Sequence, residues 1–126
     1  MPDQLFEYAV IRVVPRVERE EFVNIGVILY CPKQKFLKAI LLIDEARISA
    51  FAPGLDIECL KDNVKSFEKI AHGTPDAGPI AKLDIASRFR WLTATRSTVV
   101  QSSKVHPGLC TDAELTLKRL FNQLVG

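Results

Sequence analysis

The chain has 126 residues, of which 48% are hydrophobic and 25% are charged, and its formal net charge is +2. This length predicts a single domain over residues 1–126 with one core, and the composition excludes a disordered chain. No apolar run approaches the roughly 20 residues of a membrane span, and the first residues lack a basic leader segment, so we expect a cytoplasmic protein.

The cysteines give no sign of a disulfide framework or a metal site. Cys31, Cys59 and Cys110 are an odd number and contain no C-x-x-C pair, which favours reduced thiols. Cys31, His106 and Cys110 offer only three candidate ligands, with no close pair, whereas a structural zinc site normally needs four. The sequence therefore predicts no metal site and points to no particular cofactor.

The first third of the chain predicts an antiparallel meander. Residues 5–14, 22–30 and 36–43 are rich in branched and aromatic side chains, as strands are. Pro15 ends the first of these strands because it cannot donate to a ladder. The connections are short, and short connections between consecutive strands favour antiparallel pairing.

The remainder predicts mostly helix. We expect helices over 44–51, 56–71 and 84–91, a fourth strand over 97–101, and a terminal helix introduced by a capping box at 111–114. Gly73 suits the left-handed end of the second helix. The predicted fold is α+β, with a three- to four-stranded antiparallel sheet covered on one face by three to four helices. We expect the polar segment after Trp91 to fold back toward the first hairpin.

A polar notch interrupts the first hairpin. A loop centred near Glu18 would place Arg12 opposite Asn24 and Val10 opposite Gly26, and cross-strand partners share a face. A buried guanidinium needs carbonyl or anionic partners. Two interpretations stay open: an internal carboxylate or helix-end carbonyls satisfy Arg12 while Gly26 marks a bulge, or the notch meets a ligand or the later basic segment.

That later segment carries the excess of positive charge. Residues 80–110 contain five basic residues and only one acidic residue, Asp84. Arg96, Ser97 and Thr98 combine a guanidinium with hydroxyls, which suits an anion-holding loop. No glycine-rich phosphate loop is present, and the charge excess is too small to favour nucleic acid. A solvated helix face explains the neighbouring arginines and aromatics equally well.

The same segment contains the residues on which an enzymatic function would depend. His106 could serve as a general base, with Arg96 stabilising charge, in phosphoester or nucleic-acid chemistry. Cys110 with His106 could form a nucleophile and base pair, although a buried, inert thiol is the ordinary state of such a cysteine. No paired carboxylates are placed for acid–base work, so the catalytic residues stay unassigned.

The ordered motifs of the chain resemble a known bacterial family of short proteins that is catalogued only as a domain of unknown function. The residues that carry the resemblance are Tyr8-Ala-Val-Ile-Arg-Val-Val-Pro15, Glu21-Phe-Val-Asn-Ile-Gly-Val27, Cys31-Pro32, Arg88-Phe-Arg-Trp-Leu92, Arg96-Ser-Thr98, Gln101, His106-Pro-Gly108 and Asp112. The resemblance extends from about Tyr8 to Val125 and implies no particular activity. It also implies gene neighbourhoods that contain kinases similar to persistence toxins, and hence an accessory or regulatory role beside such a partner. Glu20 departs from the pattern, in which a glycine is often found.

The sequence thus favours a non-enzymatic binding or regulatory module for a phosphate-bearing ligand or a protein partner, with neither a membrane nor a nucleic acid as its target. The expected ligand-binding residues are those of the notch and the later segment, namely Arg12, Asn24, Arg96, Ser97, Thr98, Gln101 and His106. Two alternatives remain: a phosphoester or nucleic-acid-processing enzyme that uses His106 and Arg96, and a purely structural subunit of a complex.

Overall fold

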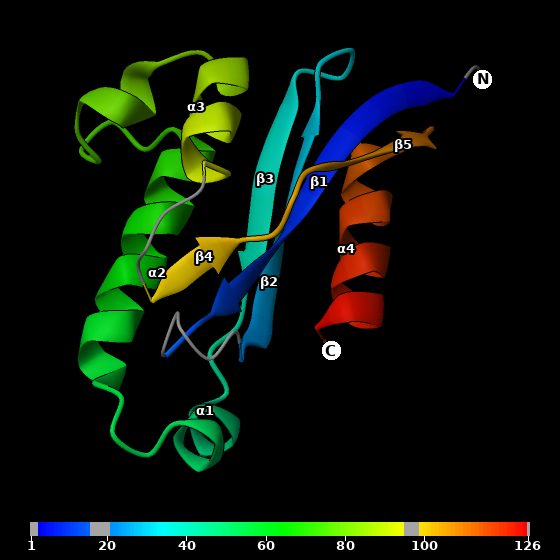
Figure 1. The fold of residues 1–126 in the computed structure, drawn as a ribbon. Helices are drawn as coiled ribbons and strands as arrows, with labels where there is room; N and C mark the ends of the chain where they lie inside the picture. The colour runs from blue at the N-terminus through cyan, green and yellow to red at the C-terminus, as the bar shows by residue number, and fades with distance from the viewer. Residues whose placement is uncertain (1–2, 16–20, 95–98, 126) are drawn as a thin grey trace.

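A computed structural model describes residues 3–15, 21–94 and 99–125 (Figure 1). It confirms the α+β class with an N-terminal meander. The described chain contains five strands, four α-helices and one 3-10 helix. Their bounds are β1 Gln4–Val13, β2 Val23–Cys31, β3 Phe36–Leu41, α1 Glu45–Phe51, α2 Ile57–His72, η2 Pro79–Lys82, α3 Ile85–Leu92, β4 Val100–Ser102, β5 His106–Cys110 and α4 Ala113–Leu124.

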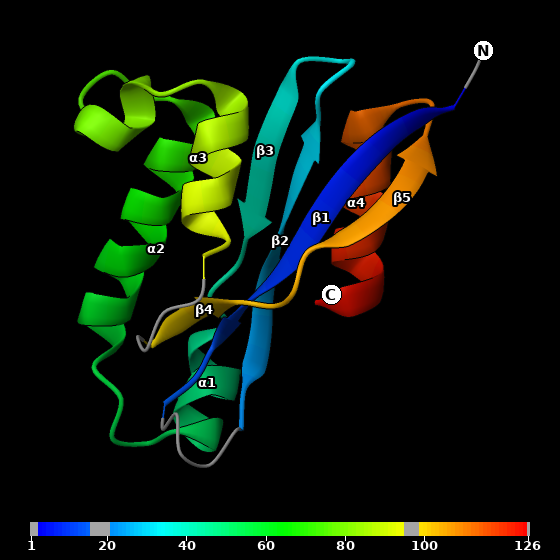
Figure 2. The ribbon, with the colours of Figure 1, turned by 45° about the horizontal axis from the view of Figure 1, so that its top comes forward.

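The sheet is antiparallel, with the order β3-β2-β1-β4, and β5 also pairs with β1. Glu7 pairs with Tyr30 of β2 and with Pro107 of β5, so β5 lies on the edge of β1 away from β2. β4 and β5 therefore follow one another along the same edge (Figure 2). This confirms that the segment after Trp91 folds back on the first hairpin.

The strand count exceeds the three to four expected because His106–Cys110 is a strand and not a loop. Pro107 and Gly108 are uncommon in strands, so the sequence did not predict this one. A proline is tolerated here because β5 is an edge strand, whose outer side needs no donor. Gly108 has a specific use, since a Cβ at this position would lie 2.5 Å from the ring of Phe6.

A bulge in β2 changes the register of the first hairpin. Arg12 pairs with Asn24 as predicted, but Gly26 pairs with Ile11 and not with Val10, because Ile25 is an extra residue between the two pairs. The four alternating apolar residues of β2, Val23, Ile25, Val27 and Leu29, therefore do not share one face. Of these, Val23 and Ile25 lie on one face of the sheet and Val27 and Leu29 on the other.

Helices cover both faces of the sheet, whereas the sequence predicted only one covered face. Apolar side chains of α1, α2 and α3 pack against Ile11, Ile28 and their neighbours. α4 packs on the opposite face (Figure 1). Its closest contacts are with β2 and β3. The central strand β2 is buried on both faces because of this arrangement, and so it has no polar face that could have revealed the second layer.

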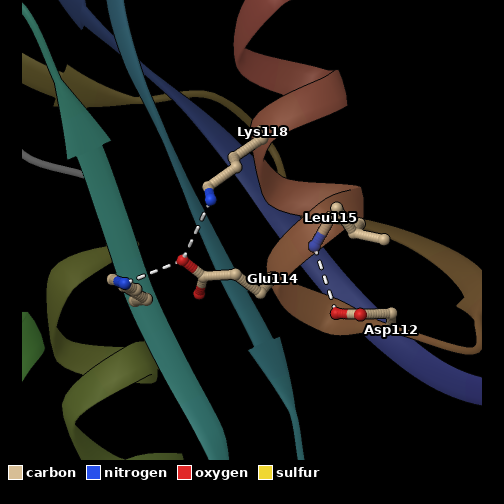
Figure 3. Close-up of polar contacts among 5 residues, drawn as sticks. Asp112, Glu114, Leu115 and Lys118 are labelled. Carbon is tan, nitrogen blue, oxygen red and sulfur yellow. Dashed lines mark hydrogen bonds and ion pairs between the residues drawn. The ribbon is translucent and has the colours of Figure 1, made fainter.

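Side-chain caps and ion pairs fix α4 against the sheet (Figure 3). The predicted capping box at 111–114 is displaced by one residue, since Asp112 is the cap and its carboxylate accepts from the Leu115 amide at 3.2 Å. Glu114 then lies between Lys118 of its own helix at 3.8 Å and Lys38 of β3 at 2.9 Å.

The predicted left-handed end of α2 at Gly73 is confirmed. Within the described part of the chain, no helix has the length and apolarity to span a membrane.

Candidate functional site

Arg12 occupies the centre of the candidate site. It is opposite Asn24 of β2 on one side and opposite Gln101 of β4 on the other, so three predicted site residues share one register position of the sheet. The two flanking residues extend from the same face as Arg12, because directly paired residues do so. Ala9, Ile11 and Val13 lie on the other face of β1, in the larger core. Arg12 therefore lies on the α4 face.

The guanidinium of Arg12 is held without a described acidic partner. Its central carbon lies 3.9 Å from the ring centroid of Phe22, a cation–π contact. The buried Nε atom has no hydrogen-bond partner among the described residues, and no described carboxylate forms an ion pair with this side chain. Burial lowers the pKa of Arg12 from its ordinary value, but an arginine stays charged at any physiological pH.

Asn24 links the site to the end of α4. Its Nδ2 donates to the Leu124 carbonyl at 3.2 Å, near the C-terminus of the helix. Its Oδ1 is buried and accepts no hydrogen bond from any described residue. A helix-end carbonyl is therefore engaged in the notch as one interpretation expected, but by the amide of Asn24 and not by Arg12.

A cavity of about 210 Å³ adjoins Asn24. Its walls come from β2, the residues after β3, the start of α1 and the end of α4, and are formed by Val23, Asn24, Ile25, Leu42, Asp44, Arg47, Ile48 and Val125. Sequence reasoning missed Arg47 and Asp44 at this place, and no local pattern could have identified them, since they reach Asn24 only through tertiary packing. A larger hollow of about 310 Å³ lies elsewhere, beside Pro15, Glu21 and residues 51–55.

His106 lies on the same face but at a distance from Arg12. It pairs with Tyr8, four residues before Arg12 on β1, and their rings lie 5.3 Å apart. Four residues of a strand span about 13 Å. Sequence reasoning placed His106 in the site but missed its aromatic partner Tyr8.

An irregular step between β4 and β5 is what brings His106 and Gln101 to one face. They are five residues apart, which in a regular strand would put them on opposite faces. Ser103 replaces the regular ladder, since its amide donates to the Val10 carbonyl and its hydroxyl accepts from the Val10 amide, both at 2.8 Å. The aligned residues Tyr8, Arg12, Gln101 and His106 are called the open strip below. α4 makes its closest contacts with β2 and β3. Along the strip, His106 is exposed, whereas Tyr8, Arg12 and Gln101 are half-buried.

Three predicted site residues, Arg96, Ser97 and Thr98, lie outside the described residues. The described chain resumes at residue 99, directly before β4. The Val99 carbonyl accepts a 2.7 Å hydrogen bond from the amide of Val14. The described chain therefore resumes beside the strand that carries Arg12.

The thiols show none of the features of a catalytic cysteine. Cys110 is buried among apolar side chains near Cys31, and burial raises its pKa, whereas an activated thiol has a lowered pKa. His106 and Cys110 are separated by four residues of one strand, about 13 Å. Among the described residues, no group of three or more His, Cys, Asp or Glu side chains could hold a metal ion.

Comparison with known proteins yields one finding. A family model described as a protein of unknown function (DUF3037) matches residues 8–125. Neither a curated protein nor a solved structure matches the sequence.

Proposed function

The chain belongs to the DUF3037 family, described as one of unknown function, and we propose that it is a non-enzymatic binding module for a phosphate-bearing ligand. Arg12, Asn24 and Gln101 form the centre of the proposed site. The observation that carries the proposal is the environment of Arg12, a guanidinium set into a sheet with no described carboxylate paired to it.

The chemistry of this arrangement favours an anion with several oxygen atoms. The guanidinium face rests on Phe22, and stacking leaves the planar edge with its fork of N–H donors for an acceptor. A phosphate group matches that fork and forms charge-assisted hydrogen bonds with it. Asn24 and Gln101 flank Arg12 on its two sides, and amide N–H groups can donate to the oxygens of a phosphate.

The segment 96–98 extends the proposed site. Arg96 would add a second positive charge, and Ser97 and Thr98 would add hydroxyl donors. The sequence places them three to five residues before Gln101, which pairs with Arg12. In this proposal they would bind the same phosphate-bearing ligand as Arg12.

A pyrophosphate titration tests the proposal. Thermal unfolding of the full chain should shift upward with pyrophosphate and not with chloride at equal ionic strength. Arg12→Lys keeps the charge but loses the planar fork, so it should reduce the shift, and Arg12→Gln should abolish it. Lys65→Gln, an exposed change on α2 across the sheet, is the matched control and should respond as the wild type does. A wild-type protein that does not respond would overturn the proposal.

A protein partner is the second candidate ligand, and a separate surface favours it. Leu5 and Leu109 pair across β1 and β5 with 54% and 64% of their surface exposed, an apolar pair at the edge of the sheet. Such a pair suits a partner in the cytoplasm, including the kinases that the family resemblance implies. Leu109→Lys should weaken capture of such a kinase while leaving pyrophosphate binding intact.

The two remaining alternatives make different predictions. An enzyme that used His106 and Arg96 would show turnover that disappears in His106→Ala while the fold survives. A purely structural subunit would show no stabilisation by any ligand, and Arg12→Ala would unfold it, since stranding a buried partner costs about 3–5 kcal/mol.

A further inference from the structure

The open strip has two chemically different ends. At one end Tyr8 and His106 form an aromatic pair with ring centroids 5.3 Å apart, and His106 is exposed. At the other end Arg12 and Gln101 present a guanidinium and an amide. About 13 Å of β1 separates the two ends. A flat aromatic group and a phosphate group could therefore be bound by the same face at the same time.

The formal charge within the strip comes from Arg12. None of its four residues is acidic, and the nearest carboxylate on β1, that of Glu7, belongs to the other face, where it pairs with Arg90 of α3 at 3.0 Å. On the α4 side, Glu114 and Lys118 face β3. Helical spacing turns Arg119 toward the opposite flank of α4, away from Glu114. The strip is thus electrically complementary to an anion.

We infer that the open strip binds a nucleoside di- or triphosphate, with the base stacked on the Tyr8–His106 pair and the terminal phosphates at Arg12. This inference rests on the proposed function and specifies its ligand. Every nucleobase has a π-face, so aromatic side chains bind bases with little preference among them. A nucleoside polyphosphate is long enough to reach both ends of the strip, whereas inorganic phosphate or a nucleoside reaches only one.

A free nucleotide fits the strip better than a single-stranded nucleic acid. Binding a strand depends on neutralising many phosphates with lysine and arginine. The chain has a formal net charge of only +2, and Arg12 is the arginine among the four residues of the strip.

Isothermal titration of the full chain with ATP, GTP, adenosine and inorganic triphosphate tests the inference. Loss of base stacking should weaken binding by about 5- to 150-fold, so inorganic triphosphate should bind that much more weakly than ATP, and adenosine should bind weakly as well. His106→Ala should weaken ATP binding without affecting triphosphate. His72→Ala, which removes the other histidine at the far end of α2, is the matched control. Amide NMR shifts should move at β1, β4 and β5 and stay unchanged in α2.

The outcomes separate this inference from the proposed function. If pyrophosphate binds in an Arg12-dependent manner but ATP binds no more tightly than triphosphate, the inference is wrong and the proposed function stands. If neither anion binds, both are wrong. Tighter binding of an oligonucleotide than of ATP, with a steep dependence on salt, would also overturn the inference and identify the ligand as a nucleic acid.

Discussion

Arg12 and Asn24 stand opposite one another across β1 and β2, and each has a buried polar atom without a partner among the described residues. The atoms are complementary, since Nε of Arg12 is a donor and Oδ1 of Asn24 is an acceptor. Unsatisfied buried groups are rare in native proteins, and an unseen water or ligand is one of their ordinary explanations. A group that both accepts and donates, such as a water molecule or a hydroxyl, would satisfy both atoms.

The first prediction separates stability from binding at Arg12. Arg12→Met removes a desolvated charge and an orphan donor while keeping most of the apolar stem. Replacing such a group with an apolar one is often neutral or stabilising. We expect the free energy of unfolding in urea to stay the same or rise, while pyrophosphate binding is lost. A large loss of stability would instead favour the structural-subunit alternative.

The second prediction concerns the bulge at the centre of the sheet. A Cβ on Gly26 would lie 2.5 Å from the Ile40 carbonyl oxygen and 2.7 Å from Cγ of Leu41, both on the neighbouring strand. Gly26→Ala should therefore lower the free energy of unfolding by about 1–3 kcal/mol, the usual cost of overpacking. Gly54→Ala is the control, since no atom lies within 4 Å of its added carbon. Chemical denaturation of both variants measures the difference, and equal stabilities would contradict the bulge geometry.

The third prediction concerns the docking of α4. Asp112→Ala removes the acceptor of the Leu115 amide (Figure 3), and the loss of such a cap costs about 1 kcal/mol. Asp112→Asn keeps an oxygen in the same place and should retain most of the stability. The Ala variant should also increase amide hydrogen exchange in the first turns of α4, while the bond from Asn24 to the Leu124 carbonyl still holds the other end. Unchanged exchange in the Ala variant would show that the cap does not anchor α4.

The fourth prediction is a pH dependence that arises from Cys110. Burial raises the pKa of this thiol above its ordinary value of 9.0. Above that pH the unfolded chain releases the proton while the folded chain retains it, so the free energy of unfolding should fall as pH rises from about 9. Below that pH the thiol is protonated in both states, so it does not make the free energy of unfolding depend on pH. Cys110→Ala should make the alkaline decline shallower, whereas Cys59→Ala, a change at an exposed thiol, should not alter it.

The sequence by itself determined the elements that depend on local chemistry. The meander, the left-handed end of α2 at Gly73 and the pairing of Arg12 with Asn24 were all predictable, because periodicity, caps and hairpin loops act over a few residues. Arg12, Asn24 and Gln101 could also be chosen from the sequence as candidate site residues, since each is polar within an apolar strand pattern.

Tertiary structure decided the rest, because the remaining choices depend on contacts distant in sequence. The bulge at Ile25 reassigns Val27 and Leu29 to the α4 face. When a strand is apolar on both faces, its sequence pattern does not indicate which face each residue takes. The pairing of β4 and β5 along one edge of β1, and the meeting of His106 with Tyr8, likewise follow from the assembled sheet, in which Ser103 offsets the two short strands.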